Sequence, residues 1–150
     1  MKPLAKVASP AAIAALRQAT ALWPRRKKAS DGLLPSSAHI NQNPNSDHNT
    51  GLAVDITHDP KHGVDCAELF VKLRDDKRVL YLIYNGRIWL KGEGEKKYTG
   101  PNPHVKHLHI SIQKKYGSDT SPWFGWAGKP KAIGKAVAKV SRLKKKTKKS

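Results

Sequence analysis

The sequence predicts an α+β protein, with a small antiparallel sheet, flanking helices, long loops and a basic C-terminal helical tail. Short β-prone segments occur at residues 52–56, 79–84, 87–90 and 107–113. Asn85-Gly86 separates two of these segments and is typical of a type I′ hairpin turn, because both turn positions need positive φ. Capping and proline signals elsewhere in the chain indicate helices rather than further strands.

Two helices are expected before the hairpin. Ser9-Pro10 combines a good N-cap with proline at the first helical position, so a helix should begin there and end before Pro24. Asp65 and Glu68 have the spacing of a capping box, which predicts a second helix through about Asp75.

Loops should connect these elements. Residues 24–49 are rich in turn-forming residues, and residues 91–103 are rich in glycine and proline, so both segments are expected to lack regular structure. The domain should close near the aromatic residues at 123–126. Cys66, in the first turn of the second helix, should be a small buried residue.

The formal net charge of +18 is concentrated at the two ends of the chain. Residues 31–128 hold twelve Lys or Arg and all eleven acids, so this part is nearly neutral. Residues 1–30 hold seven Lys or Arg and residues 129–150 hold ten, with no acid in either segment. We therefore divide the chain into a domain at 1–128 and a basic amphipathic or disordered tail at 129–150. Such ends imply an anionic partner, either nucleic acid, a membrane surface or a bacterial wall polymer.

The sequence shows no convincing targeting or membrane segment. The apolar part near the start is short and interrupted by Pro10, so a secretory signal is not expected. No run reaches the ~20 apolar residues needed to span a bilayer. With a single cysteine, an internal disulfide and a cysteine-based zinc site are excluded, so any metal must use His and carboxylate ligands.

Histidines of the last predicted strand should lie side by side. Alternation places His107, His109 and Ser111 on one face, while the apolar residues between them form the core face. One such histidine is more often packed or surface-exposed than a ligand. Two of them, with His104 just upstream, indicate a site.

His48 and Asp55 supply the missing half of such a site. A turn at Gly51 can fold the loop that carries His48 toward the strand that carries Asp55. Catalytic zinc takes three His or carboxylate ligands and keeps one position for water. Alone, His48 would be a loop residue and Asp55 a strand-end cap, so it is the two stretches together that predict a metal site on one face of the sheet.

Two motifs carry a resemblance to known enzymes. The pattern Ser-x-His-x-x-Gly-x-Ala-x-Asp resembles a signature of zinc D-Ala-D-Ala-type peptidases, and its residues here are Ser46, His48, Gly51, Ala53 and Asp55. The pattern His-x-x-His-x-His is similar to that of penicillin-insensitive murein endopeptidase, and its residues are His104, His107 and His109. Both families belong to a group that includes the lysostaphin-type wall hydrolases. Residues 14–113 also look like the small peptidase domains of actinobacterial phage endolysins.

The resemblance implies that His48, Asp55 and His109 bind Zn²⁺ and that His107 acts beside the metal. Many D-Ala-D-Ala-type enzymes carry a glutamate base shortly before the last histidine ligand, but no glutamate follows Glu95 in this part of the chain. The base should therefore be an imidazole.

Further residues are expected to assist this site. His104 would hold the oxyanion or orient the water, and the choice between His104 and His107 as main base stays open at this point. Ser46 would fix the ligand geometry. Arg87, Tyr98 and Asn102 are candidates for holding substrate carboxylates. The isolated histidines are better explained as loop residues than as ligands, and they are His39, His58 and His62.

The implied function is hydrolysis of a stem-peptide amide bond in bacterial peptidoglycan by metal-activated water. Zinc lowers the pKa of a bound water to about 7, and an unperturbed imidazole with a pKa near 6.5 suits the proton transfers. We expect a monomer that is made in the cytoplasm, released through a phage membrane pore and held at the wall by its basic tail, which binds an anionic wall polymer or membrane surface.

Two other functions remain open. A nucleic-acid-binding protein would use the basic ends and leave the histidines with structural roles. Because the middle of the chain is nearly neutral and shows no groove-reading motif, no specific nucleic acid is expected. A catalytically inactive wall-binding module would keep the zinc for stability and lack the reaction.

Overall fold

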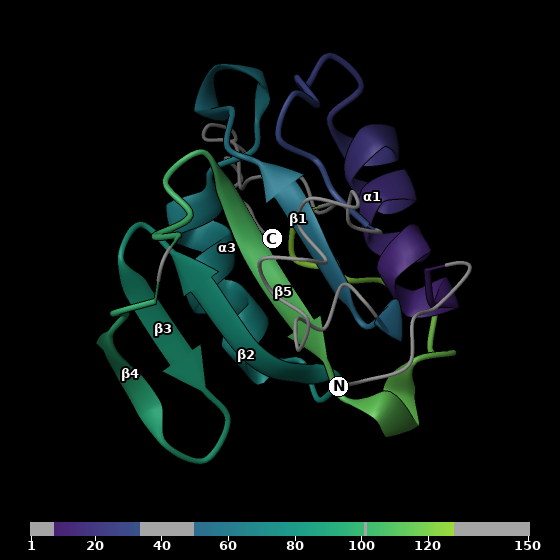
Figure 1. The fold of residues 1–150 in the computed structure, drawn as a ribbon. Coiled ribbons are helices and arrows are strands. Elements are labelled where there is room, and N and C mark those ends of the chain that lie inside the picture. The colour runs from purple at the N-terminus through teal and green to yellow at the C-terminus, as the bar shows by residue number, and fades with distance from the viewer. Residues whose placement is uncertain (1–7, 34–49, 101, 128–150) are drawn as a thin grey trace, which may run out of the picture.

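The computed structural model describes residues 8–33, 50–100 and 102–127 of the 150-residue chain. In these residues a five-stranded antiparallel sheet is packed against α-helices (Figure 1), which confirms the predicted α+β class. The helices and strands, in chain order, are α1 (Pro10–Leu22), β1 (Ala53–Thr57), α3 (Cys66–Lys72), β2 (Val79–Tyr84), β3 (Arg87–Leu90), β4 (Gly94–Lys97) and β5 (His107–Ile112). Short 3-10 helices are η2 (Pro60–His62), η3 (Leu73–Asp75) and η4 (Lys114–Tyr116).

The strand order in the sheet is β1-β5-β2-β3-β4. The last strand in the sequence therefore lies between the first two, and it is antiparallel to both. Figure 1 shows α3 behind the sheet and α1 beside β1. This arrangement brings segments about fifty residues apart in the chain into direct hydrogen-bonded contact.

The hydrophobic core lies on one face of the sheet. Val54 of β1, Ile110 of β5 and Leu82 of β2 are all 0 % exposed and lie side by side across the three central strands. The helices add Leu69 and Phe70 from α3 and a row of buried alanines from α1, namely Ala11, Ala12, Ala15 and Ala19. Small alanine side chains let α1 lie close to the sheet, so this helix fills space with its backbone rather than with large side chains.

Local signals in the sequence correctly predict most helix boundaries. The Ser9 side chain accepts a hydrogen bond from the Ala12 N–H, and α1 ends at Leu22. The Asp65 side chain accepts hydrogen bonds from the N–H groups of Ala67 and Glu68. The helix that follows ends at Lys72 and continues as η3 to Asp75, as predicted.

The hairpin and the closing aromatic residues are also confirmed. Asn85 and Gly86 have φ values of 49° and 78°, as a type I′ turn requires. Trp123 and Phe124 are 1 % and 2 % exposed, and the Trp123 indole N–H donates to the Ala11 carbonyl at 2.9 Å. Cys66 is buried, as predicted.

One strand was not predicted. Residues 91–103 were expected to form a loop, but β4 lies within them and pairs with β3. Its sequence, Gly-Glu-Lys-Lys, has low strand propensity and its last three residues are exposed. It forms a strand because the turn at residues 91–93, closed by a hydrogen bond from the Glu93 N–H to the Leu90 carbonyl, returns the chain beside β3. Charged residues are common on such edge strands.

Among the described residues, no helix is long and apolar enough to cross a membrane. The predicted tail at 129–150 lies outside the described residues.

Replacing Asp65 by Ala should lower the free energy of unfolding by about 1 kcal/mol, because two N–H groups at the start of α3 lose their acceptor. Glu68→Ala, in the first turn of the same helix, is the matched control and should have a smaller effect, because the cap is made by Asp65. Urea unfolding measures both variants, and an equal loss in the two would contradict this assignment of the cap.

Candidate functional site

The register of the sheet assembles a cluster of one carboxylate and three imidazoles. Asp55 of β1 lies directly opposite His109 of β5, and Thr57 lies opposite His107. Because directly opposed residues share a face, Asp55, His107 and His109 all lie on the face of the sheet that points away from the core. The loop before β5 adds His104 to this group.

An unusual backbone conformation holds His104 in place. Its φ is 60°, in the left-handed region that few non-glycine residues adopt. Its N–H donates to Asn102 Oδ1 at 2.9 Å, and its carbonyl accepts from the Asn85 N–H at 3.0 Å. These bonds fasten the loop to the hairpin turn and bring the His104 ring centroid to 4.9 Å from that of His107 and 5.4 Å from that of His109.

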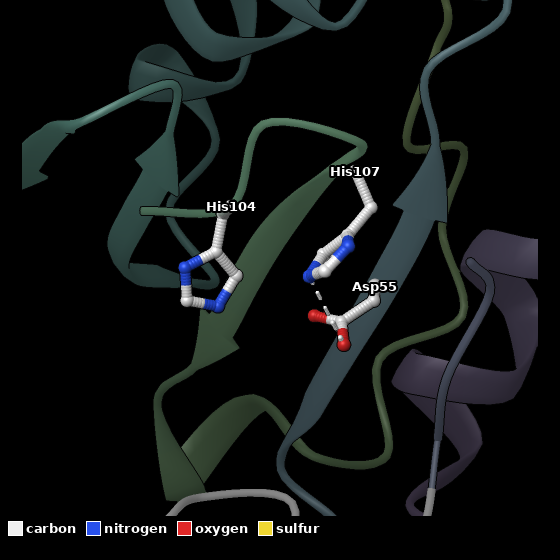
Figure 2. Close-up of side chains that lie close together, drawn as sticks. All are labelled: Asp55, His104 and His107. Carbon is white, nitrogen blue, oxygen red and sulfur yellow. Dashed lines mark ion pairs between the residues drawn. The ribbon is translucent and has the colours of Figure 1, made fainter. Parts of the chain in front are cut away.

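Three of these residues could hold a metal ion together. Asp55, His104 and His107 each offer one ligand atom, and these atoms all lie within 4.8 Å of one another. Figure 2 shows the His107 ring directed at the Asp55 carboxylate with the His104 ring beside them. His107 Nε2 lies 3.6 Å from Asp55 Oδ2. Imidazole and carboxylate are donor types that divalent transition-metal ions, including zinc, take in proteins.

His109 contacts the other oxygen of the same carboxylate. Its Nδ1 is 3.1 Å from Asp55 Oδ1, and its Nε2 is 2.9 Å from Ser111 Oγ. Two ligands bound at about 2.0 Å to one tetrahedral ion lie roughly 3.3 Å apart. The observed separation of Asp55 Oδ1 and His109 Nδ1 therefore already fits a shared ion.

His104 offers a buried nitrogen that a metal ion could use as a ligand atom. Its Nδ1 is buried and has no hydrogen-bond partner among the described residues. The pKa of His104 is lowered to about 4, mainly by burial and also by the nearby His109 and His107, while Asp55 acts in the opposite direction. The imidazole is therefore neutral at pH 7 and keeps a lone pair available, which metal binding requires.

The chain before β1 supports the Asp55 backbone and side chain. Gly32 and Asp55 exchange backbone hydrogen bonds of 3.1 and 2.8 Å. A Cβ at position 32 would lie 3.2 Å from Asp55 Oδ2, so glycine lets this segment pass close to the carboxylate. Arg26, which is 5 % exposed, pairs with both carboxylate oxygens of Asp31 at 3.0 and 2.9 Å and so fixes this segment. No motif in the sequence marked Gly32 or Arg26 as part of the site.

The order Asp55, His109, Ser111 matches the hydrogen-bonded order of a serine-hydrolase triad. Ser111 is 0 % exposed, in the interior of β5. A substrate carbonyl cannot reach a hydroxyl at such a position, so Ser111 is not a nucleophile.

The structure brings together four of the predicted site residues, namely Asp55, His104, His107 and His109. The predicted ligand His48 and the predicted Ser46 lie outside the described residues, as does His39. Gly51, where a turn was predicted, has a φ of 76°. Tyr98 is also close, since its ring meets the His104 ring edge-on with a centroid distance of 6.0 Å.

Arg87 is not brought to the cluster. It lies opposite Tyr84, whose ring packs near Phe70 of α3, so Arg87 belongs to the helix-covered face of the sheet. Its guanidinium pairs with Glu95 Oε2 at 2.8 Å, and Arg74 binds the other oxygen of the same carboxylate. The substrate contact of Arg87 stays a prediction. Its place on this face could not be foreseen, because the pairing register that sets the face is not visible in the loop sequence.

The other predicted candidates in the described residues have structural partners. The Asn102 side chain accepts from the His104 N–H. His58 Nδ1 accepts from the Cys66 N–H at 3.1 Å, at the start of α3. His62 Nδ1 lies 2.8 Å from Asp59 Oδ2. His58 and His62 are therefore structural loop residues, as expected, and Asn102 positions His104.

Comparison with protein families places the chain in one of them. The family model described as VldE, C-terminal domain, matches residues 6–109, which is more than two thirds of the chain. The protein therefore belongs to this family, and the matched segment includes all four residues of the cluster. Comparisons with curated proteins and with solved structures gave no match.

Acid should destabilise the metal-free protein partly through His104. The folded pKa of about 4 lies below the unfolded value of about 6.5, so the unfolded state takes up a proton first as the pH falls. The free energy of unfolding should therefore fall between pH 6.5 and pH 4, and this part of the loss should be absent in His104→Gln. Urea unfolding in a chelator at pH 7 and pH 4.5 tests this, and equal losses in both proteins would contradict it.

Proposed function

We propose that this protein is a zinc-dependent peptidase that cleaves a stem-peptide amide bond of bacterial peptidoglycan. The observation that carries the proposal is the convergence of Asp55, His104, His107 and His109 on one face of the sheet. All four residues belong to the two motifs that resemble those of wall peptidases. A carboxylate surrounded by imidazoles is suited to metal-assisted hydrolysis.

We assign Asp55 and His109 as ligands, with His48 as the third. Asp55 Oδ1 and His109 Nδ1 are at ligand separation, 3.1 Å, whereas His107 Nε2 is 3.6 Å from Asp55 Oδ2. His109 is 5 % exposed, and its ring also stacks on Tyr81 with a centroid distance of 5.5 Å. A ring held on several sides suits a ligand, because little conformational entropy is lost when the ion binds.

His107 and His104 then lie beside the metal ligands. When bound, zinc supplies Lewis-acid activation of water and of the substrate carbonyl. His107 Nε2, beside the Asp55 carboxylate, accepts the proton of the attacking water and delivers it to the leaving amine. His104, with its pKa lowered to about 4, is a weak base at neutral pH and acts as a neutral hydrogen-bonding group toward water or oxyanion. Because a weak base is a poor proton acceptor at neutral pH, we assign His107 as the main base.

The surroundings of the cluster suit a small anionic peptide. Val105 is 52 % exposed and Lys106 is exposed, and both lie between His104 and His107 in the chain. Together with Tyr98, they offer an apolar contact for methyl groups and a positive charge for carboxylates. The basic residues 129–150 would hold the enzyme on anionic wall polymers or lipids by charge, an attraction that weakens with added salt.

The purified protein should bind about one zinc ion per chain. Asp55→Ala, His109→Ala and His48→Ala should each weaken zinc binding by more than about 100-fold, beyond the range typical of partners outside the ligand set. His104→Ala and His107→Ala should keep the ion. The measurement is chelator competition, and the matched control is His62→Ala, which removes a histidine outside the cluster.

The same experiment discriminates between ligand sets. Loss of zinc in His104→Ala and His107→Ala, with retention in His109→Ala, would move the ion to the group formed by Asp55, His104 and His107. A wild-type protein that binds no zinc would overturn the proposed function.

His107→Ala should lower the rate of peptidoglycan hydrolysis by about 10²–10⁴-fold while zinc remains bound, because the proton acceptor is lost and the ligands stay. Clearing of a purified-wall suspension gives the rate, and mass spectrometry of the released muropeptides identifies the bond. His62→Ala should hydrolyse at the wild-type rate. Full activity of His107→Ala would refute its role as base, and a wild-type protein that binds zinc without hydrolysis would be a wall-binding module.

A further inference from the structure

His109 has a polar neighbour at each ring nitrogen. Nδ1 lies 3.1 Å from Asp55 Oδ1, and Nε2 lies 2.9 Å from Ser111 Oγ. A neutral imidazole carries one proton, so the two nitrogens must differ in role. In one tautomer Nδ1–H donates to Asp55 and Nε2 accepts from the Ser111 hydroxyl. In the other, Nε2–H donates to Ser111 and the Nδ1 lone pair faces the carboxylate.

The second tautomer needs a cation. Without one, the Nδ1 lone pair and a carboxylate oxygen, both acceptors, would face each other at 3.1 Å. With a divalent ion between them, both atoms become ligands and the repulsion is replaced by attraction. The first tautomer is therefore the stable one in the metal-free protein, and the second in the metal-bound protein.

Ser111 is suited to both tautomers. A serine hydroxyl can donate one hydrogen bond and accept others, so it serves Nε2 as a donor or as an acceptor after a simple rotation. Ser111 is 0 % exposed, and it lies opposite Ala53 on β1 and Tyr81 on β2. At a position closed to water, removing the hydroxyl takes away the hydrogen-bond partner that the structure shows for Nε2.

We propose that Ser111 is a positioning residue for the metal site: its Oγ accepts a hydrogen bond from the Nε2–H of His109, so that Nδ1 becomes the ligand atom. This inference rests on the proposed function, because it takes zinc on Asp55 and His109. When the ion binds, Nδ1 releases its proton to water and Nε2 takes up one proton from water, so the imidazole stays neutral. The hydroxyl hydrogen of Ser111 turns away from Nε2 at the same time.

The other contacts of His109 hold its ring in place, so the role of Ser111 in placing the ring proton can be distinguished from a packing role. The Tyr81 ring is nearly parallel to the His109 ring, with an interplanar angle of 21°, and the Asp55 carboxylate lies on the opposite side of the ring from Ser111. These contacts hold the ring in the Ser111→Ala variant. The substitution therefore changes where the proton is held more than where the ring lies.

The test measures zinc affinity and tautomer in the full-length protein. In chelator competition, Ser111→Ala should bind zinc about 10–100-fold more weakly than wild type. Ser111→Thr, which keeps the hydroxyl, should recover most of this loss. The matched control is Ser121→Ala, which removes a serine hydroxyl that bonds to Asp119 away from the cluster and should leave the affinity unchanged.

Nitrogen-15 NMR of the histidine rings gives a second readout that needs no variant. The wild-type protein should show the His109 proton on Nδ1 in the metal-free state and on Nε2 after zinc is added. An Nε2 proton in the metal-free state would overturn the proposal, as would zinc affinity of Ser111→Ala within about threefold of wild type, well below the usual effect of such partners. If the wild-type protein binds zinc but either of these contradicting results is obtained, only the role of Ser111 is refuted. A wild-type protein without zinc affinity would refute the proposed function itself.

Discussion

The antiparallel pairing of β1 with β5 is the interaction on which the rest of the structure depends. It places Asp55 opposite His109 and joins two stretches that are about fifty residues apart. A slip of one residue would turn the histidines toward the core and the isoleucines toward the site, because side chains alternate along a strand. The buried apolar face of the two strands, with Val54, Ile56 and Ile110 all at 0 % exposure, holds the register that the polar face needs.

Two buried arginines fasten the loops around this sheet. Arg78 is 2 % exposed, bonds to both oxygens of Asp76 and to three carbonyls near residue 121, and lies 3.7 Å from the Trp123 ring centroid. Arg26 binds both carboxylate oxygens of Asp31 and so fastens the segment that borders Asp55. A buried guanidinium is tolerated only when its donors are paired, so each arginine fixes its segment firmly. The chain at Gly32, which borders the cluster, is thus held in place by Arg26 and Asp31, which lie outside it.

Several features of the cluster, taken by themselves, lower the stability of the fold. His104 has a left-handed backbone conformation and an imidazole that resists protonation, and Asp55 is a carboxylate shared by two histidines. Such strain and close packing of titratable groups are concentrated at functional sites, where a ligand or substrate offsets them. The match to the VldE C-terminal domain family includes the segment that holds all of these features.

Local chemistry made much of the fold predictable. Ser9 and Asp65 are recognisable caps, Asn85-Gly86 is a recognisable turn, and the alternation in β5 separates the histidine face from the core face. Each of these depends on interactions within a few residues. The strand β4 was missed because its residues are polar, and it is ordered by pairing with β3 rather than by its own propensity.

The sequence alone determined which residue types are available for a metal site and that one strand presents two of the histidines on one face. Only the tertiary structure decided how the residues are grouped: that Asp55 contacts His107 and His109 through different oxygens, that Ser111 adjoins His109, and that Arg87 belongs to the other face. The physical reason is that these relations depend on the register between strands distant in the chain. That register is set by the packing of the whole core, whereas caps, turns and alternation are set by neighbouring residues.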